Sequence, residues 1–248
     1  IRDSIKIVMP YACKGLMGGI KQILETNLEY VDGVDTVEID ISSNIAIHTA
    51  QNELKTIDGV KNIIAVASGK GGVGKSTTSV NFALALAQEG ARVGIIDADI
   101  YGPSMGMMLG IPDGQRPETA DGKWFLPIQA HGVEANSMAF LVDNNTPMVW
   151  RGPKVSGALL QLATQTKWRN LDYLIVDLPP GTGDIQLTLA QRIPVTGAII
   201  VTTPQDIALL DCKKGIEMFR KVDIDVLGVI ENMSVHICSN CGHHEPLF

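Results

Sequence analysis

The sequence is poor in three features that each mark a large class of proteins. It has four cysteines in 248 residues, too few for a disulfide scaffold, so we expect a reducing, cytoplasmic setting. It has no apolar run approaching the roughly 18 residues of a membrane span, and from its start we expect no signal peptide. It also lacks an excess of basic residues, since 20 Lys and Arg stand against 27 Asp and Glu. We therefore expect neither nucleic acid nor a membrane as a partner.

What the chain does have is 45% hydrophobic residues, enough to bury a sizeable core. Its first part combines an apolar run (5–8), a helical pattern (15–31) and an alternating strand (34–41). The segment "NIAIHTA" (44–50) is a candidate for a further strand. We interpret residues 1–54 as a small, partial α+β domain.

A polar linker, residues 55–61, leads to a second domain over residues 62–248. Because the chain starts without a methionine and stops at "EPLF", we expect both domains to continue beyond its ends. The second domain opens with an apolar strand, the glycine-rich loop "GKGGVGKS" (69–76) and a helical pattern that ends at Gly90.

This loop fits the pattern G-x-x-x-x-G-K-S/T in the strand–loop–helix context that the pattern requires. Glycines let backbone N–H groups converge on phosphate oxygens, and the helix N-terminus adds the positive end of its dipole. We expect Lys75 to contact the β- and γ-phosphates of ATP and the Ser76 hydroxyl to ligate Mg²⁺. The predicted nucleotide-binding residues of the loop are Gly69, Lys70, Gly71, Gly72, Val73, Gly74, Lys75, Ser76 and Thr77.

Three aspartates stand at the ends of two further apolar strands. Asp97 and Asp99 follow "ARVGII", and Asp177 follows "LDYLIV". The carboxyl ends of strands in a parallel sheet are where ligands bind. Since Mg²⁺ prefers oxygen ligands and keeps several waters, we expect Asp177 to hold it through water as a Walker B carboxylate.

The later apolar runs predict the fold class. "TGAIIVTTP" (196–204) and "DVLGVIENM" (225–233) are typical of parallel strands covered on both faces, and a helical pattern lies between them. We predict an α/β fold with a doubly wound, mostly parallel sheet and helices on both faces. The helical pattern at 157–168 is expected to turn its apolar face to the core, and Cys212 is expected to be an ordinary packed thiol.

The segment "HICSNCGHH" (236–244) holds Cys238 and Cys241 in a C-x-x-C-G pattern. Such a knuckle lets backbone N–H groups face the sulfurs while both thiolates bind one ion, and it forms half of a zinc or Cys₄ iron–sulfur site. Three sources could supply the missing ligands: His236, His243 or His244; a second knuckle in a missing segment; or the same pair in another subunit. A redox-active dithiol also remains open.

With Lys70, the loop resembles the deviant Walker A motif of the ATPases that include MinD, ParA and the nitrogenase iron protein. The resemblance implies a homodimer in which Lys70 reaches the partner's nucleotide. It also implies that Asp99 belongs to switch I and positions or activates the attacking water, so that Lys70, Lys75 and Asp99 form the catalytic set. By the same resemblance, Asp97 supports the Mg²⁺ shell and Asn232 hydrogen-bonds the adenine.

A closer resemblance rests on the order of seven segments: "SGKGGVGKS", "DADIYGPS", "MVWRGP", "VDLPPGTGDIQLTLAQ", "VTTPQDIAL", "ENMS" and "CSNCG". They occur as in the Mrp/ApbC family of iron–sulfur cluster carrier ATPases, and residues 1–54 resemble part of the MIP18-like domain that precedes many such ATPases. The resemblance implies a 4Fe-4S cluster held between two subunits by Cys238 and Cys241 and passed to apoprotein acceptors, with ATP hydrolysis. It also makes Arg151 a candidate switch or dimer residue.

Alternative functions remain open at this point. One is a positioning or partition ATPase of the MinD/ParA type, against which the acidic charge stands. Another is a zinc-stabilised ATPase scaffold. An electron-transfer ATPase like the nitrogenase iron protein is disfavoured, because the cluster cysteines of that protein do not form a C-x-x-C pair.

Overall fold

The computed structural model describes residues 2–28, 30–32, 36–50, 54–99, 102, 104–112, 114–140 and 152–247. In this part of the chain the main body is a seven-stranded sheet of order β11-β10-β3-β9-β4-β8-β7. Only the short β7 runs antiparallel to its neighbour, so the predicted mostly parallel sheet is confirmed. The strands are β3 (Val60–Ala67), β4 (Val93–Asp97), β7 (Ile128–Ala130), β8 (Val133–Ser137), β9 (Leu171–Asp177), β10 (Gly197–Thr202) and β11 (Val226–Glu231).

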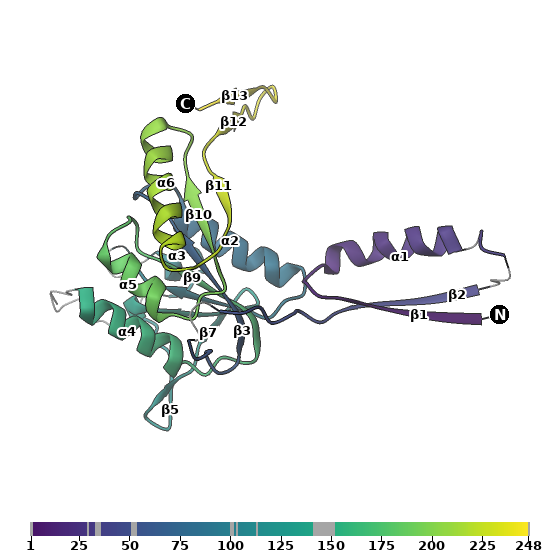
Figure 1. Ribbon diagram of the computed structural model, residues 1–248, viewed down its shortest axis with the longest axis horizontal. Coiled ribbons are helices and arrows are strands. Elements are labelled where there is room, and N and C mark those ends of the chain that lie inside the picture. The colour runs from purple at the N-terminus through teal and green to yellow at the C-terminus, as the bar shows by residue number, and fades with distance from the viewer. Residues whose placement is uncertain are drawn as a thin grey trace.

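Helices cover both faces of this sheet, as predicted (Figure 1). One face packs against α2 (Lys75–Gln88), and the other against α4 (Gly152–Gln165), α5 (Asp184–Arg192) and α6 (Asp206–Arg220). Shorter elements are α3 (Met105–Met108), β5 (Thr119–Ala120), β6 (Trp124–Phe125) and a 3₁₀ turn, η2 (Met138–Phe140).

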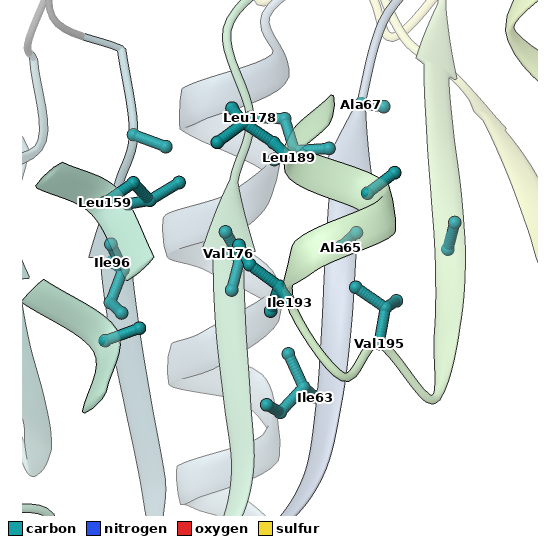
Figure 2. Packing of buried hydrophobic residues seen from close by; sticks show 14 of the residues in the cluster. Ile63, Ala65, Ala67, Ile96, Leu159, Val176, Leu178, Leu189, Ile193 and Val195 are labelled. Carbon is teal, nitrogen blue, oxygen red and sulfur yellow. The ribbon is translucent and has the colours of Figure 1, made fainter. Parts of the chain in front are cut away.

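The two hydrophobic clusters alternate along β3, because successive side chains of a strand point to opposite faces. Ile63 and Ala65 belong to the cluster beneath α4, α5 and α6, whereas Ile64 and Val66 pack on the α2 side. Figure 2 shows the first cluster, in which side chains from β3, α4 and α5 meet. A strand buried on both faces explains why this part of the sequence is apolar without interruption.

Helix α4 confirms the expected orientation of its apolar face. Leu159, Leu162 and Ala163 are all fully buried in the cluster shared with α5 and α6. Cys212 is likewise a packed thiol within α6, and burial raises its pKa above the ordinary value. These apolar groups therefore stabilise the core.

Strand β11 corrects one prediction. Its sequence predicts a strand covered on both faces, but β10 is its one sheet neighbour in the described part of the chain. The register slips where Ala198 pairs with Val226 and Ile199 with Gly228, which leaves Leu227 without a partner. Leu227 is 59% exposed and Val229 48% exposed. An apolar run predicts a strand, but it does not show whether the strand lies inside the sheet or at its edge.

The N-terminal part is a strand–helix–strand unit: β1 (Arg2–Met9), α1 (Lys14–Leu28) and β2 (Thr36–Ser43). The two strands pair in parallel from Arg2↔Thr36 to Met9↔Ser43, and Figure 1 shows the unit projecting from the main body. These elements agree with the expected strand, helix and strand. The boundaries at 54 and 61 stay predictions, although β3 begins at Val60, before the predicted start of the second domain.

The expected strand at 44–50 is absent, because a side chain takes the place of a strand partner. Asn62, at the start of β3, is almost fully buried. Its Oδ1 accepts a hydrogen bond from the His48 N–H at 2.9 Å, and its Nδ2 donates to the Ala46 carbonyl at 2.8 Å. The N–H groups of Asn44 and Ala46 donate to the Met9 and Pro10 carbonyls, so the Asn62 amide is one of several contacts that hold this segment. Period-two alternation in the sequence cannot reveal a contact between a backbone segment and a remote side chain.

The end of the sheet opposite the glycine-rich loop carries a buried carboxylate, Asp172 on β9. Lys61 lies 2.8 Å and Arg92 3.1 Å from its Oδ1, and the Arg92 backbone N–H donates to Oδ2 at 2.9 Å. Burial by itself would raise the pKa of Asp172, but the hydrogen bonds and charges of Arg92 and Lys61 outweigh it and lower the pKa to about 2. Lys61 also donates to the Ile45 carbonyl, so this cluster joins the N-terminal segment to the sheet.

We expect Asp172→Asn to lower the free energy of unfolding at pH 7 by about 1 to 2 kcal/mol, allowing for screening at the exposed Arg92. Because the folded pKa lies below the ordinary 3.8, the carboxylate stabilises the fold above about pH 4 and loses this effect as the pH falls towards 2. Urea denaturation from pH 7 downwards should show the gap between variant and wild type closing. Asp121→Asn, at an exposed pair with Lys167, is the control and should change little. An equal gap at every pH would contradict this assignment.

Among the described residues, no helix combines the length and the apolar character needed to cross a membrane.

Candidate functional site

The glycine-rich loop lies between the carboxyl end of β3 and the start of α2, as the motif predicts. Gly72 and Gly74 have φ values of 81° and 83°, in the left-handed region that favours glycine. Gly74 precedes the first residue of α2, and no side chain caps the helix there. The first N–H groups of the helix are therefore available to phosphate oxygens.

A cavity of about 200 Å³ opens beside this loop. It is lined by Ser68, Gly71, Gly72, Gly74, Lys75, Ser76, Thr77, Asp99, Ser104, Met108 and Pro180. The structure thus brings Asp99, from the segment after β4, to the predicted nucleotide-binding residues. The Asp99 Oδ1 accepts a hydrogen bond from the Gly102 N–H at 3.1 Å, within the same segment.

Asp177, at the end of β9, is fully buried against the start of α2. The Lys75 Nζ lies 2.8 Å from its Oδ1, and the Ser76 and Ser79 hydroxyls each donate to the carboxylate at 2.6 Å. Ser76 and Asp177 therefore offer a hydroxyl and a carboxylate oxygen side by side, which are hard ligands that fit Mg²⁺. Sequence reasoning missed Ser79, although its position three residues after Ser76 puts both on one face of a helix.

Asp97 is buried at the end of β4, and backbone groups hold both of its oxygens. Oδ1 accepts from the Asp99 N–H at 3.0 Å, and Oδ2 from the N–H groups of Ser104 and Met105 at 3.2 and 3.3 Å. Burial, and then repulsion from Asp177, raise the pKa of Asp97 to about 6. These contacts fix the segment that carries Asp99, whereas a role in the Mg²⁺ shell stays a prediction.

Lys70 is half-buried at the start of the loop, and its backbone carbonyl accepts a hydrogen bond from the Ser68 hydroxyl at 2.9 Å. Within the described ranges its ammonium group makes no hydrogen bond or ion pair. This charge is therefore available for a group outside the described part of the chain. Arg151, the other candidate dimer residue, lies outside the described residues.

Asn232, the first residue after β11, contacts the glycine-rich loop directly. Its Nδ2 donates to the Val73 carbonyl at 3.0 Å, and a Cβ at Gly74 would overlap its amide. The close approach explains why glycine is needed at position 74 as well as its positive φ. An adenine contact by Asn232 stays a prediction, while the contact with the loop is a finding.

The cysteine pair lies in a hairpin of β12 (Val235–Ile237) and β13 (His244–Pro246), which extends from the end of β11 (Figure 1). The Cys238 N–H donates to the His243 carbonyl, and the Gly242 N–H to the Cys238 carbonyl. Backbone N–H groups of Cys241 and Asn240 face the Cys238 sulfur and lower the pKa of its thiol. This is the knuckle geometry that the spacing predicts, and it favours the thiolate that binds metals.

The knuckle holds two ligands and no more within the described chain. No three His, Cys, Asp or Glu side chains among the described residues are placed to share a metal ion, so His236, His243 and His244 do not complete the site there. Cys238 is a partly exposed free thiol and Cys241 an exposed one, whereas Cys13 and Cys212 are buried. A metal ion bound by this pair would need its further ligands from outside the described part.

Comparisons with known proteins find relatives over most of the chain. Residues 59–248 match the ParA family described as NUBPL iron-transfer P-loop NTPase. The iron-sulfur cluster carrier protein of Pseudomonas fragi is 68% identical over 226 residues, which cover 91% of this chain and 79% of that protein. The protein of the same name from Escherichia coli K12 is 57% identical over 244 residues, covering 98% of this chain and 66% of that protein.

A solved structure is also similar to most of this chain. It is the nucleotide-binding protein of Archaeoglobus fulgidus in complex with ADP, with cobalt found in it. The two chains are 38% identical and superpose with a TM-score of 0.68, over 77% of this chain and 74% of the other.

Proposed function

We propose, from the premise that the chain belongs to the ParA/NUBPL family of iron-transfer P-loop NTPases, that it is an ATP-hydrolysing carrier of iron–sulfur clusters. The cargo would be a 4Fe-4S cluster, bound between two copies of the chain and passed to apoproteins. Family membership confirms the resemblance drawn from the motifs. The observation that carries the proposal is the exposed knuckle of Cys238 and Cys241, which offers two thiolates and lacks further ligands in the described residues.

A second copy of the chain would complete the site. A 4Fe-4S cluster takes four cysteine ligands, and a two-fold axis brings two identical pairs together. The hairpin exposes apolar side chains that an interface would cover, since Val235 is 51%, Ile237 57% and Leu247 47% exposed. The ammonium of Lys70, which has no partner among the described residues, would contact the nucleotide of the other copy.

The nucleotide site supports hydrolysis by placing charge around the phosphates. Lys75 would leave Asp177 and contact the β- and γ-phosphates, while the helix N-terminus binds phosphate oxygens. Mg²⁺, held by Ser76 and by Asp177 through water, would neutralise phosphate charge. Asp99 would orient the attacking water, with its segment held by Asp97.

Anaerobic reconstitution with iron and sulfide tests the proposal. We expect about four iron and four sulfide ions per two chains, a dimer in sedimentation velocity, and transfer of the cluster to an apo-ferredoxin. Stoichiometric zinc with no iron uptake would instead identify a structural zinc site. A cytoplasmic location is part of the proposal and rests on the four free thiols.

A further inference from the structure

Asn232 is held by both the sheet and the nucleotide-binding loop. Its backbone N–H donates to the Thr202 carbonyl at the end of β10, at 2.8 Å. Its side-chain Nδ2 donates to the Val73 carbonyl of the loop, at 3.0 Å. Cys238 follows in the chain after a short turn and the strand β12. One residue thus lies between the phosphate-binding loop and the cysteine knuckle.

The turn after Asn232 also lies close to the glycine-rich loop. Met233 has a φ of 56°, a left-handed conformation that is uncommon for a residue other than glycine. Its Cε lies 3.7 Å from the place where a Cβ of Gly74 would be. Contact with the loop therefore determines the direction in which the chain leaves β11. Non-glycine residues keep such a conformation when the surrounding structure imposes it.

The hairpin beyond this turn has few other attachments. The backbone hydrogen bonds among the described residues 235–247 all stay within 234–247. Besides the β12–β13 ladder, they run from Cys238 to His243, from Gly242 to Cys238 and from Leu247 to Ser234. Strand β11 is itself an exposed edge strand. A small change at the Asn232 turn would accordingly move the whole knuckle, because no other backbone hydrogen bond in the described part joins it to the main body.

We propose that Asn232 is the positioning residue through which occupancy of the nucleotide site changes the position of the Cys238–Cys241 knuckle. This proposal rests on the proposed function, because the movement would couple cluster release to the nucleotide that is bound. When phosphate oxygens accept hydrogen bonds from the N–H groups of the loop, the Val73 carbonyl shifts. The Asn232 amide follows that carbonyl, and the turn carries the shift to the hairpin. Coupling of this kind requires that both sites bias the same two arrangements.

Thiol alkylation in cluster-free, reduced protein tests this without depending on cluster chemistry. The rates of iodoacetamide labelling at Cys238 and Cys241 are measured by mass spectrometry without nucleotide, with ADP and with a non-hydrolysable ATP analogue. In the wild type we expect saturating nucleotide to change these rates by about fivefold or more. Cys13 and Cys212 are buried and report unfolding within the same sample, so their labelling should stay slow.

In Asn232→Ala, the nucleotide dependence of labelling should disappear at saturating nucleotide. Asn81→Ala is the matched control, since the Asn81 side chain also donates to a backbone carbonyl, that of Thr77, but within α2 and away from β11. It should keep the wild-type response. Insertion of two glycines between Met233 and Ser234 separates the hairpin from Asn232 without removing the amide. This insertion should abolish the response while nucleotide affinity stays unchanged. It therefore tests the proposal even if Asn232→Ala folds poorly.

A nucleotide response that persists in both the Asn232→Ala and the insertion proteins would overturn the proposal, as would a wild type without any response. Failure of the proposed function looks different. Reconstitution would then yield no iron–sulfur cluster, while the labelling rates at Cys238 and Cys241 still depended on nucleotide in the wild type and not in Asn232→Ala.

Discussion

Replacement of Cys238 or Cys241 by alanine is expected to abolish iron uptake on reconstitution, to below about a tenth of the wild-type level. Each copy contributes two thiolates, so either substitution leaves a dimer with two of the four ligands that a 4Fe-4S cluster requires. The hairpin should remain folded, because its ladder from Val235↔Pro246 to Ile237↔His244 is made by backbone groups. Iron and sulfide analysis together with visible absorbance gives the measurement.

Cys212→Ala is the control for this pair of variants. The Cys212 side chain, on α6, is packed in the hydrophobic core. Its removal should therefore lower stability somewhat but leave iron uptake intact. ATP hydrolysis in Cys238→Ala should change little, because no knuckle residue lines the cavity beside the glycine-rich loop. Full iron uptake by Cys238→Ala or Cys241→Ala would show that other ligands hold the metal, and the two-chain site would have to be abandoned.

Lys75→Ala should have the second large effect, and it should be visible in two measurements. ATP hydrolysis is expected to fall by about a hundredfold or more, because the lysine no longer stabilises charge on the β- and γ-phosphates. The nucleotide-free protein should also lose about 3 to 5 kcal/mol of unfolding free energy, since the buried Asp177 carboxylate would lose its ion-pair partner. Urea denaturation without nucleotide measures this loss.

The double variant Lys75→Ala/Asp177→Ala separates the two effects. Removing both charges should restore much of the stability but none of the hydrolysis, because the stability loss comes from the unpaired charge. Lys214→Ala breaks an exposed pair with Asp211 and should change stability by about 0.5 kcal/mol or less. If Lys75→Ala proved as stable as the wild type, the contact between Lys75 and Asp177 would not contribute to the free energy of unfolding.

Much of the fold could be predicted from sequence because it depends on local patterns. Apolar runs, helical spacing and glycine-rich turns identified the strands and helices that form the parallel sheet and its covering layers. The errors arose where a long-range partner decides the outcome. The apolar run of β11 did not show that it is an edge strand, and the alternation at 44–50 did not show that the Asn62 side chain would bind that backbone.

The candidate site divides in the same way. The glycine-rich loop and the cysteine knuckle are each contiguous, so spacing and residue type were enough to predict both. Ser79 escaped notice because its role depends on Asp177, which comes 98 positions later. Asn232 was expected to contact a base, yet the structure adds a contact with the loop that no local pattern indicates.

The sequence by itself determined the chemistry available: a phosphate-binding loop with two lysines, carboxylates at strand ends and a pair of thiolates. Only the tertiary structure decided which of these groups meet. Asp177 contacts Lys75, Ser76 and Ser79, and Asn232 contacts a loop residue 159 positions earlier in the chain. The physical reason is that a spacing pattern records interactions within one or two turns of chain, whereas packing of the sheet brings together strand ends that are remote in sequence.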